Sequence, residues 1–126
     1  MANRNGAPTF ALDRSTFQVA GIVTLGSGAI ASQDCLGFSV ARTGTGAYTL
    51  TLEDKWPQLL NVSINRIGSA AADTYIQVLT EAVASTKTIT FGHYTGGGTV
   101  AADPASGVKL VISLTLRNSS QDRKGA

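Results

Sequence analysis

Apolar and polar residues alternate along most of the chain with the period of two that is typical of β-strands. The clearest run lies toward the C-terminal end, where every second residue between positions 108 and 117 is apolar. These residues are Val108, Leu110, Ile112, Leu114 and Leu116. Because most of the residues between them are polar, the run predicts a strand of about ten residues with one face in the core.

The same alternation recurs in shorter segments that are rich in Thr, Val, Ile, Tyr and Phe, which strands favour. Glycine-rich turns separate these segments, and Gly44-Thr45-Gly46 predicts a hairpin connection. Between Asp54 and Leu60 the presence of Pro57 disfavours a helix, so we expect a loop or a single 3₁₀ turn there. The predicted strands cover residues 16–25, 36–42, 47–53, 61–67, 74–83, 86–93 and 108–117.

This series of short strands indicates an all-β fold, either a β-sandwich or a jelly-roll-like fold. A length of 126 residues suits a single domain. We place the body at residues 15–118, between an extended N-terminal arm (residues 1–14) and a C-terminal tail (residues 119–126). In an extended arm, Phe10 and Leu12 face the same side, so both can enter apolar grooves of a partner. Alternatively, they cover an open edge of their own sheet.

Composition narrows the choice of partners. Charged residues make up 14% of the chain, against roughly 25% in ordinary soluble domains, and the net charge is only +2. A nucleic-acid partner requires a stripe of Lys and Arg, which the chain lacks, and a membrane span requires about 20 consecutive apolar residues. We therefore expect neither partner. The low charge and the many small Ala, Ser, Thr and Gly side chains predict a homo-oligomer of closely packed copies, a trimer in particular.

The sequence contains little that could support catalysis. His93 is the single histidine and Cys35 the single cysteine, and nothing in the sequence brings them together. Three or four His, Cys or carboxylate ligands are needed for zinc, and no Lys-Ser/Thr follows Gly96-Gly97-Gly98 as in a phosphate-binding loop. We therefore predict no catalytic residue, no cofactor and no metal, and a protein that is not an enzyme.

The only tryptophan, Trp56, is a candidate for partner contact. A tryptophan can anchor a protein interface or stack on a sugar. It can equally be a core or rim aromatic that packs beside Pro57. We group Trp56 with Phe10 and Leu12 as the candidate contact residues.

A longer pattern extends from Phe38 to Leu60. It consists of an apolar strand, the turn Arg42-Thr43-Gly44-Thr45-Gly46, an alternating strand led by an aromatic residue, an acidic-basic pair, Trp56 and a pair of leucines. This pattern resembles a stretch of small structural proteins of tailed bacteriophages, and the segment from Leu114 to Ser119 is similar to them as well. The resemblance points to the head decoration (cement) type.

The resemblance implies a protein that binds the outer surface of a capsid shell, with the major capsid protein as its partner. Such a protein is made in the host cytoplasm and acts on the exterior of the virion, and the family has no catalytic residues to transfer. Two alternatives stay open. A receptor- or carbohydrate-binding tail-fibre domain would use exposed aromatics, for which the chain offers Trp56, Tyr75 and Tyr94. A shell-forming coat protein usually has a basic arm, whereas this arm holds only Arg4 and Arg14.

Overall fold

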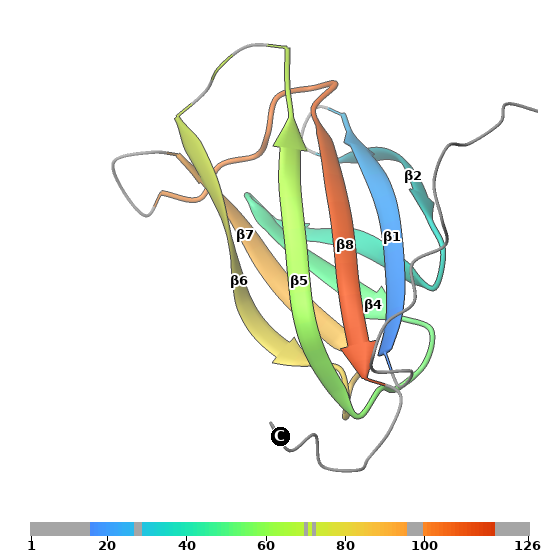
Figure 1. The fold of residues 1–126 in the computed structure, drawn as a ribbon. Coiled ribbons are helices and arrows are strands. Elements are labelled where there is room, and N and C mark those ends of the chain that lie inside the picture. The colour runs from blue at the N-terminus through green and yellow to red at the C-terminus, as the bar shows by residue number, and fades with distance from the viewer. Residues whose placement is uncertain (1–15, 27–28, 70, 72, 96–99, 118–126) are drawn as a thin grey trace, which may run out of the picture.

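The computed structural model describes residues 16–26, 29–69, 71, 73–95 and 100–117 (Figure 1). Within these residues the chain forms eight strands and no helix, as the sequence predicts for an all-β protein. The strands are β1 (Thr16–Leu25), β2 (Ile30–Cys35), β3 (Phe38–Gly44), β4 (Ala47–Leu52), β5 (Gln58–Ile67), β6 (Thr74–Ala82), β7 (Thr88–Thr95) and β8 (Lys109–Arg117).

The strands are arranged in two antiparallel four-stranded sheets that pack face to face, which confirms the predicted β-sandwich. Sheet A has the order β2-β1-β8-β5, and sheet B has the order β3-β4-β7-β6. In Figure 1, β5, β8 and β1 of sheet A lie in front of β4, β7 and β6 of sheet B. The first and last strands, β1 and β8, are therefore neighbours at the centre of sheet A.

The core lies between the two sheets and contains one side-chain parity of each central strand. Along β8, Leu110, Ile112, Leu114 and Leu116 are each 0% exposed, as the alternation predicts. In sheet B, the rings of Tyr48 and Phe91 stack with their centroids 5.4 Å apart. The buried apolar cluster comprises Val23, Leu25, Phe38, Val40, Tyr48, Leu50, Leu52, Val83, Ile89, Phe91, Val108, Leu110, Ile112, Leu114 and Leu116.

The two ends of the sandwich are formed by different strand ends and connections. Thr16 pairs with Arg117, so β1 begins where β8 ends, and we call this the terminal end. At the opposite end, the loop end, Lys109 pairs with Ile67, and the connection that follows β5 lies near the one that precedes β8. There the predicted hairpin turn joins β3 to β4, with Gly46 at a positive φ of 63°.

Two sequence predictions require correction. The strand β2 was not predicted, because Ala31, Ser32, Gln33 and Asp34 show no apolar alternation and are all exposed. This strand is held by backbone pairing with β1. In addition, β5 already begins at Gln58, inside the stretch expected to form a loop or 3₁₀ turn. Residues 58–60 were excluded because of Pro57, but a proline directly before a strand removes no ladder hydrogen bond.

Candidate interaction surfaces

Of the three predicted contact residues, only Trp56 lies within the described part of the chain; Phe10 and Leu12 lie outside it. Trp56 is half-buried against the core, and its backbone N–H donates to the Val83 carbonyl at 3.1 Å. Its ring lies 5.4 Å from the ring of Phe17, centroid to centroid, at a tilt of 45°. Phe17 is 50% exposed, so the two rings form an aromatic pair at the terminal end that is open to solvent on the Phe17 side.

Phe17 was not singled out in the sequence, although a usable signal existed. It falls on the same parity of β1 as Val23 and Leu25, which are buried in the core. A large apolar residue at the first positions of a core-facing row sits at the rim of a sandwich, where burial is incomplete. Phe17 therefore belongs with Trp56 in one candidate contact surface.

At the loop end, Asp103 connects the β3–β4 hairpin to the segment before β8. Its carboxylate accepts from Arg42 Nε at 3.0 Å, Arg42 Nη2 at 2.8 Å and the Gly46 backbone N–H at 2.9 Å. The Arg42 guanidinium, followed by the Gly46 N–H, lowers the pKa of Asp103 below its ordinary value of 3.8. The Asp103 hydrogen bond in turn raises the pKa of Arg42. These bonds occupy both carboxylate oxygens of Asp103, so the cluster ties the β3–β4 hairpin to the segment before β8.

His93 lies beside this cluster and is held there by hydrogen bonds. It is only 2% exposed, and its Nδ1 lies 2.7 Å from the Ala102 carbonyl oxygen. The Ala102 N–H donates to the His93 carbonyl at 3.0 Å, and the His93 N–H donates to the Gly46 carbonyl at 2.8 Å. These bonds tie the segment around Ala102 to β7.

The structure does not bring His93 together with Cys35. Cys35 lies in β2, an edge strand of sheet A that contacts the edge strand β3 of sheet B, whereas His93 lies in β7, which β4 separates from β3. Cys35 is half-buried against the core, and burial is the main cause that raises the pKa of its thiol. Across the described ranges, no group of three or more His, Cys, Asp or Glu residues is placed to hold a metal ion.

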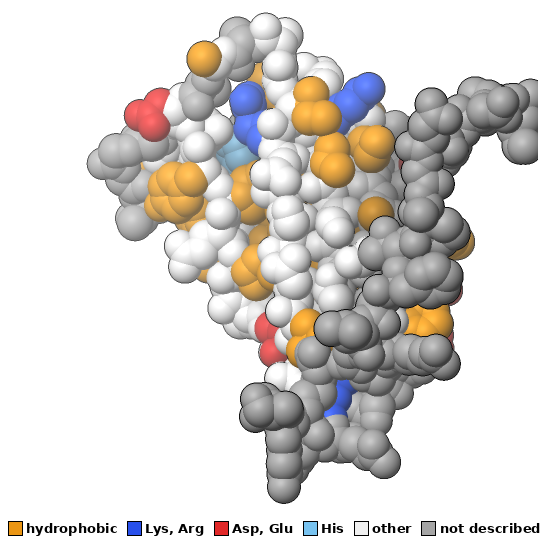
Figure 2. Space-filling view, viewed as in Figure 1, with side chains coloured by type: hydrophobic (Ala, Val, Ile, Leu, Met, Phe, Trp, Pro, Cys, Tyr) orange, Lys and Arg blue, Asp and Glu red, His pale blue; other side chains and the backbone are white. Residues whose placement is uncertain are grey.

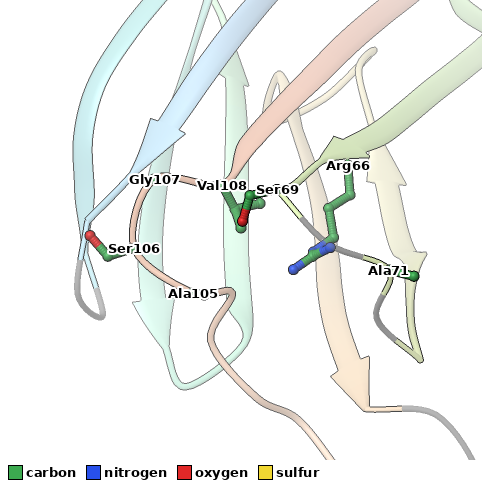
Figure 3. A pocket seen from close by; sticks show the side chains of 7 residues that line it. All are labelled: Arg66, Ser69, Ala71, Ala105, Ser106, Gly107 and Val108. Carbon is green, nitrogen blue, oxygen red and sulfur yellow. The ribbon is translucent and has the colours of Figure 1, made fainter.

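A cavity of about 300 Å³ opens at the loop end (Figure 3). It lies between the connection that follows β5 and the turn that precedes β8. The lining residues are Arg66, Ser69, Ala71, Ala105, Ser106, Gly107 and Val108, and no carboxylate is among them. Figure 3 shows the Arg66 side chain extending from β5 into this space.

The outer face of sheet B forms a surface without a charged side chain among the described residues. Thr49 pairs with Thr90 and Thr51 with Thr88, so two neighbouring strands place four threonines at its centre. We call it the threonine face; it comprises Ser39, Ala41, Ala47, Thr49, Thr51, Tyr75, Gln77, Thr80, Ala82, Thr88, Thr90, Gly92 and Tyr94. Short, uncharged side chains of this kind let another surface approach closely.

The outer face of sheet A differs from the threonine face. Charged side chains stand on it, including Asp34 and Lys109 at positions paired with Ile22 and Thr24 of β1. Figure 2 shows that much of this face is polar, with apolar and basic side chains near the loop end. Its exposed apolar residues there include Ile22 and Ile67.

The three aromatics considered for sugar binding do not share one surface. Tyr75 and Tyr94 are directly paired and their rings stack with centroids 5.2 Å apart, near the loop end of the threonine face. Trp56 lies at the terminal end, next to Phe17. A single aromatic platform built from all three is therefore not present.

The chain matches no known protein family, and no curated protein or solved structure is significantly similar to it. Within the described ranges, none of the elements is a helix long and apolar enough to span a membrane.

Proposed function

We propose that the chain is a non-enzymatic structural protein that decorates a bacteriophage capsid and stabilises it by binding the outer surface of the shell. The proposal rests on the resemblance of residues 38–60 to small structural proteins of tailed phages. The structural observation that carries it is the aromatic pair of Phe17 and Trp56 at the terminal end. A half-exposed aromatic on a rigid body is the kind of side chain that anchors protein interfaces.

The aromatic pair is held in place before any partner binds. Trp56 packs against the core and is fixed through its backbone bond to Val83. Phe17 is held by its pairing with Leu116 of β8, whereas the pairing of β1 with β2 begins only at Gly21. Little side-chain freedom is lost on binding. Because Phe17 is already half-buried, covering the rest of its ring contributes about half the gain of a full side chain, roughly 0.8–1.5 kcal/mol. This free energy gives only weak binding for a single copy. An oligomer that binds through several copies at once binds the shell more tightly.

The threonine face supports the homo-oligomer, and the trimer, that belongs to this proposal. Two such faces can meet without removing a charge from water, which would cost several kcal/mol per ion. Its tyrosine pair supplies the larger side chains that interface cores favour. Sedimentation of the isolated protein tests this part, since a strict monomer of 13.0 kDa at high concentration contradicts it and a closed shell supports the coat-protein alternative.

The decoration proposal is tested on virions of the phage that encodes the chain. Virions lacking the protein are mixed with purified wild-type, Phe17→Ala, Trp56→Ala or Ile67→Ala protein, and shell occupancy is measured by electron cryo-microscopy. Ile67 is the matched control. Its exposed fraction of 53% is similar to that of Phe17, but it lies at the loop end, away from the aromatic pair. We expect the two aromatic variants to lose occupancy and Ile67→Ala to keep it. Wild-type protein that adds no density to the shell overturns the proposal.

The arm is tested separately by deleting residues 1–12. If Phe10 and Leu12 contact the shell or a neighbouring copy, the truncated protein keeps its circular dichroism spectrum and loses occupancy on the virion. If they cover an edge of their own sheet, the truncated protein loses stability instead. If occupancy on the virion is unchanged, neither Phe10 nor Leu12 belongs to the contact surface. The contact then depends on Phe17 and Trp56, which the point variants test.

A further inference from the structure

Arg66 occupies an unusual position in the sandwich. It pairs with Leu110 of β8, which is fully buried, and it follows Ile64 on the same side-chain parity of β5. This parity faces the core, so a basic side chain ends a row that is otherwise apolar. Arg66 is half-buried there, at the loop end.

The Arg66 guanidinium has no partner among the residues that the structure describes. Its Nε is buried and forms no hydrogen bond. The ion pair of the loop end joins Arg42 to Asp103, and both carboxylate oxygens of Asp103 are already bonded. The Nη groups point into the cavity (Figure 3), and no hydrogen bond of theirs is found in the described structure, so an acceptor that enters the cavity can bond to them.

The surroundings of the guanidinium leave room for such an acceptor. Among the described residues that line the cavity of about 300 Å³ there is no Asp or Glu, and Ser69 adds a hydroxyl while Ala71 and Ala105 add methyl groups. Gly68 lies against the guanidinium, because a Cβ at this position would come within 2.8 Å of Arg66 Nη1. In Figure 3 the Arg66 nitrogens point into the space between Ser69 and Ala105, whereas the Ser106 side chain points to the other side of the turn.

We infer that this cavity is a binding site for a carboxylate group. An arginine matches a carboxylate through two parallel N–H donors, and here the two Nη groups supply an end-on pair because Nε is buried. A carboxylate carries a single negative charge, which one arginine neutralises, whereas a phosphate group carries nearly two. The methyl groups of the lining suit the aliphatic part of an acidic side chain. The inference does not depend on the proposed attachment to a capsid.

The site is tested on the full-length protein by ¹H–¹⁵N NMR, which detects the Arg66 Nε–H directly. The probes are sodium acetate, the capped tripeptide Ac-Ala-Glu-Ala-NH₂ and sodium phosphate, each titrated at constant ionic strength. We expect a saturable shift of the Arg66 Nε–H with acetate and with the peptide. Binding of the peptide identifies a protein side chain as a suitable source, and binding of acetate alone identifies a small free carboxylate.

Variants establish which groups carry the binding. Arg66→Gln should weaken carboxylate binding by at least about tenfold, since a charge-assisted bond is lost, and Arg66→Lys should weaken it less because the charge remains. Gly68→Ala should also weaken it, by displacing the guanidinium while keeping its charge. Lys109→Gln is the matched control for charge, because Lys109 is exposed on β8 and is not among the lining residues.

The inference is overturned if no probe gives a saturable shift, if phosphate binds more tightly than both carboxylates, or if Arg66→Gln binds as the wild type does. A folding defect of Arg66→Gln does not remove the test, because the wild-type Arg66 Nε–H and the Gly68→Ala variant report on the same site.

Discussion

The side-chain amide of Gln33 forms two hydrogen bonds with the backbone of Val40: Nε2 donates to the Val40 carbonyl at 3.1 Å, and the Val40 N–H donates to Oε1 at 2.9 Å. Gln33 lies in β2, an edge strand of sheet A, and Val40 lies in β3, an edge strand of sheet B. The amide thus bonds to backbone groups that an edge strand leaves without a partner. One side of the sandwich is closed by this contact.

Replacing Gln33 with alanine should lower the free energy of unfolding by about 1–2 kcal/mol, because both bonds are lost together. Gln18→Ala is the matched control, since Gln18 is exposed on β1 and no side-chain hydrogen bond is found for it in the described structure. Urea denaturation followed by circular dichroism measures both variants. Equal stability of the two would show that the Gln33 contact does not hold the sheets together.

Gly46 and Gly107 both have positive φ values, 63° and 87°, but they differ in what surrounds them. A Cβ at Gly46 would lie 2.6 Å from the His93 carbonyl oxygen and 2.7 Å from the Ala102 nitrogen, whereas a Cβ at Gly107 would meet nothing within 4 Å. Gly107→Ala should therefore cost about 1–2 kcal/mol for the left-handed conformation alone. Gly46→Ala should cost about 2–5 kcal/mol, because backbone atoms must also move. Thermal or urea unfolding of the two variants measures which one loses more stability. A larger loss for Gly107→Ala than for Gly46→Ala would contradict the prediction.

The Asp103 cluster predicts a dependence of stability on pH. The pKa of Asp103 is lower in the folded chain than its ordinary value of 3.8, chiefly because of the hydrogen bond from Arg42. A carboxyl whose pKa is lowered by folding adds stability when the pH is above its unfolded value, and this contribution is lost as the pH falls through the folded value. Asp103→Asn should therefore be less stable than the wild type at pH 7, with a difference that shrinks below pH 3.8.

The control for this series is Asp34→Asn, which removes an exposed carboxylate that forms no ion pair in the described structure. Urea unfolding of the three proteins at pH 7 and at pH 3 measures the effect. A difference between wild type and Asp103→Asn that stays constant over this range would show that the carboxylate charge is not what stabilises the loop end.

Cys35 should react slowly with alkylating reagents. Burial raises the pKa of its thiol above the ordinary value of 9.0, and the neighbouring Asp34 raises it further. Because the thiolate is the reactive form, iodoacetamide at pH 8 should modify the folded protein severalfold more slowly than the urea-unfolded protein. Asp34→Asn should increase the rate in the folded state. Equal rates for folded and unfolded protein would contradict the predicted effect of burial.

Most of the fold could be predicted from the alternation of side chains, because a strand with one face in the core shows its pairing pattern directly in the sequence. The row from Leu110 to Leu116 is the best example. The strand β2 could not be predicted in this way, because its order comes from backbone pairing with β1 and from the contact between Gln33 and Val40. Neither contact produces a pattern of apolar residues within β2 itself.

The candidate surfaces could be predicted only in part. Trp56 was recognisable as the single tryptophan, whereas its partner Phe17 is separated from it by 39 positions (56 minus 17) and meets it only through the packing of the sheets. Arg66 could not be identified as a candidate site residue from the sequence, because a single arginine at the end of a strand is common. What sets it apart is the cavity in front of its guanidinium, which depends on the positions of all its neighbours, since buried nitrogens without an acceptor are also found in His93 and Arg117.

The ends of the connection between β7 and β8 suit the chain for carrying added sequence. The Thr95 N–H donates to the Val100 carbonyl at 3.0 Å, and Tyr94 forms a bridge with Ala101, so the chain is pinned on both sides of residues 96–99. With the two ends fixed, each doubling of the length between them costs only about 0.6 kcal/mol in loop entropy. Thr95, one of the fixed points, pairs with Thr74 at the loop end, opposite the aromatic pair. If the aromatic pair faces a capsid, the same geometry turns the protein into a carrier that displays peptides on the outside of a particle.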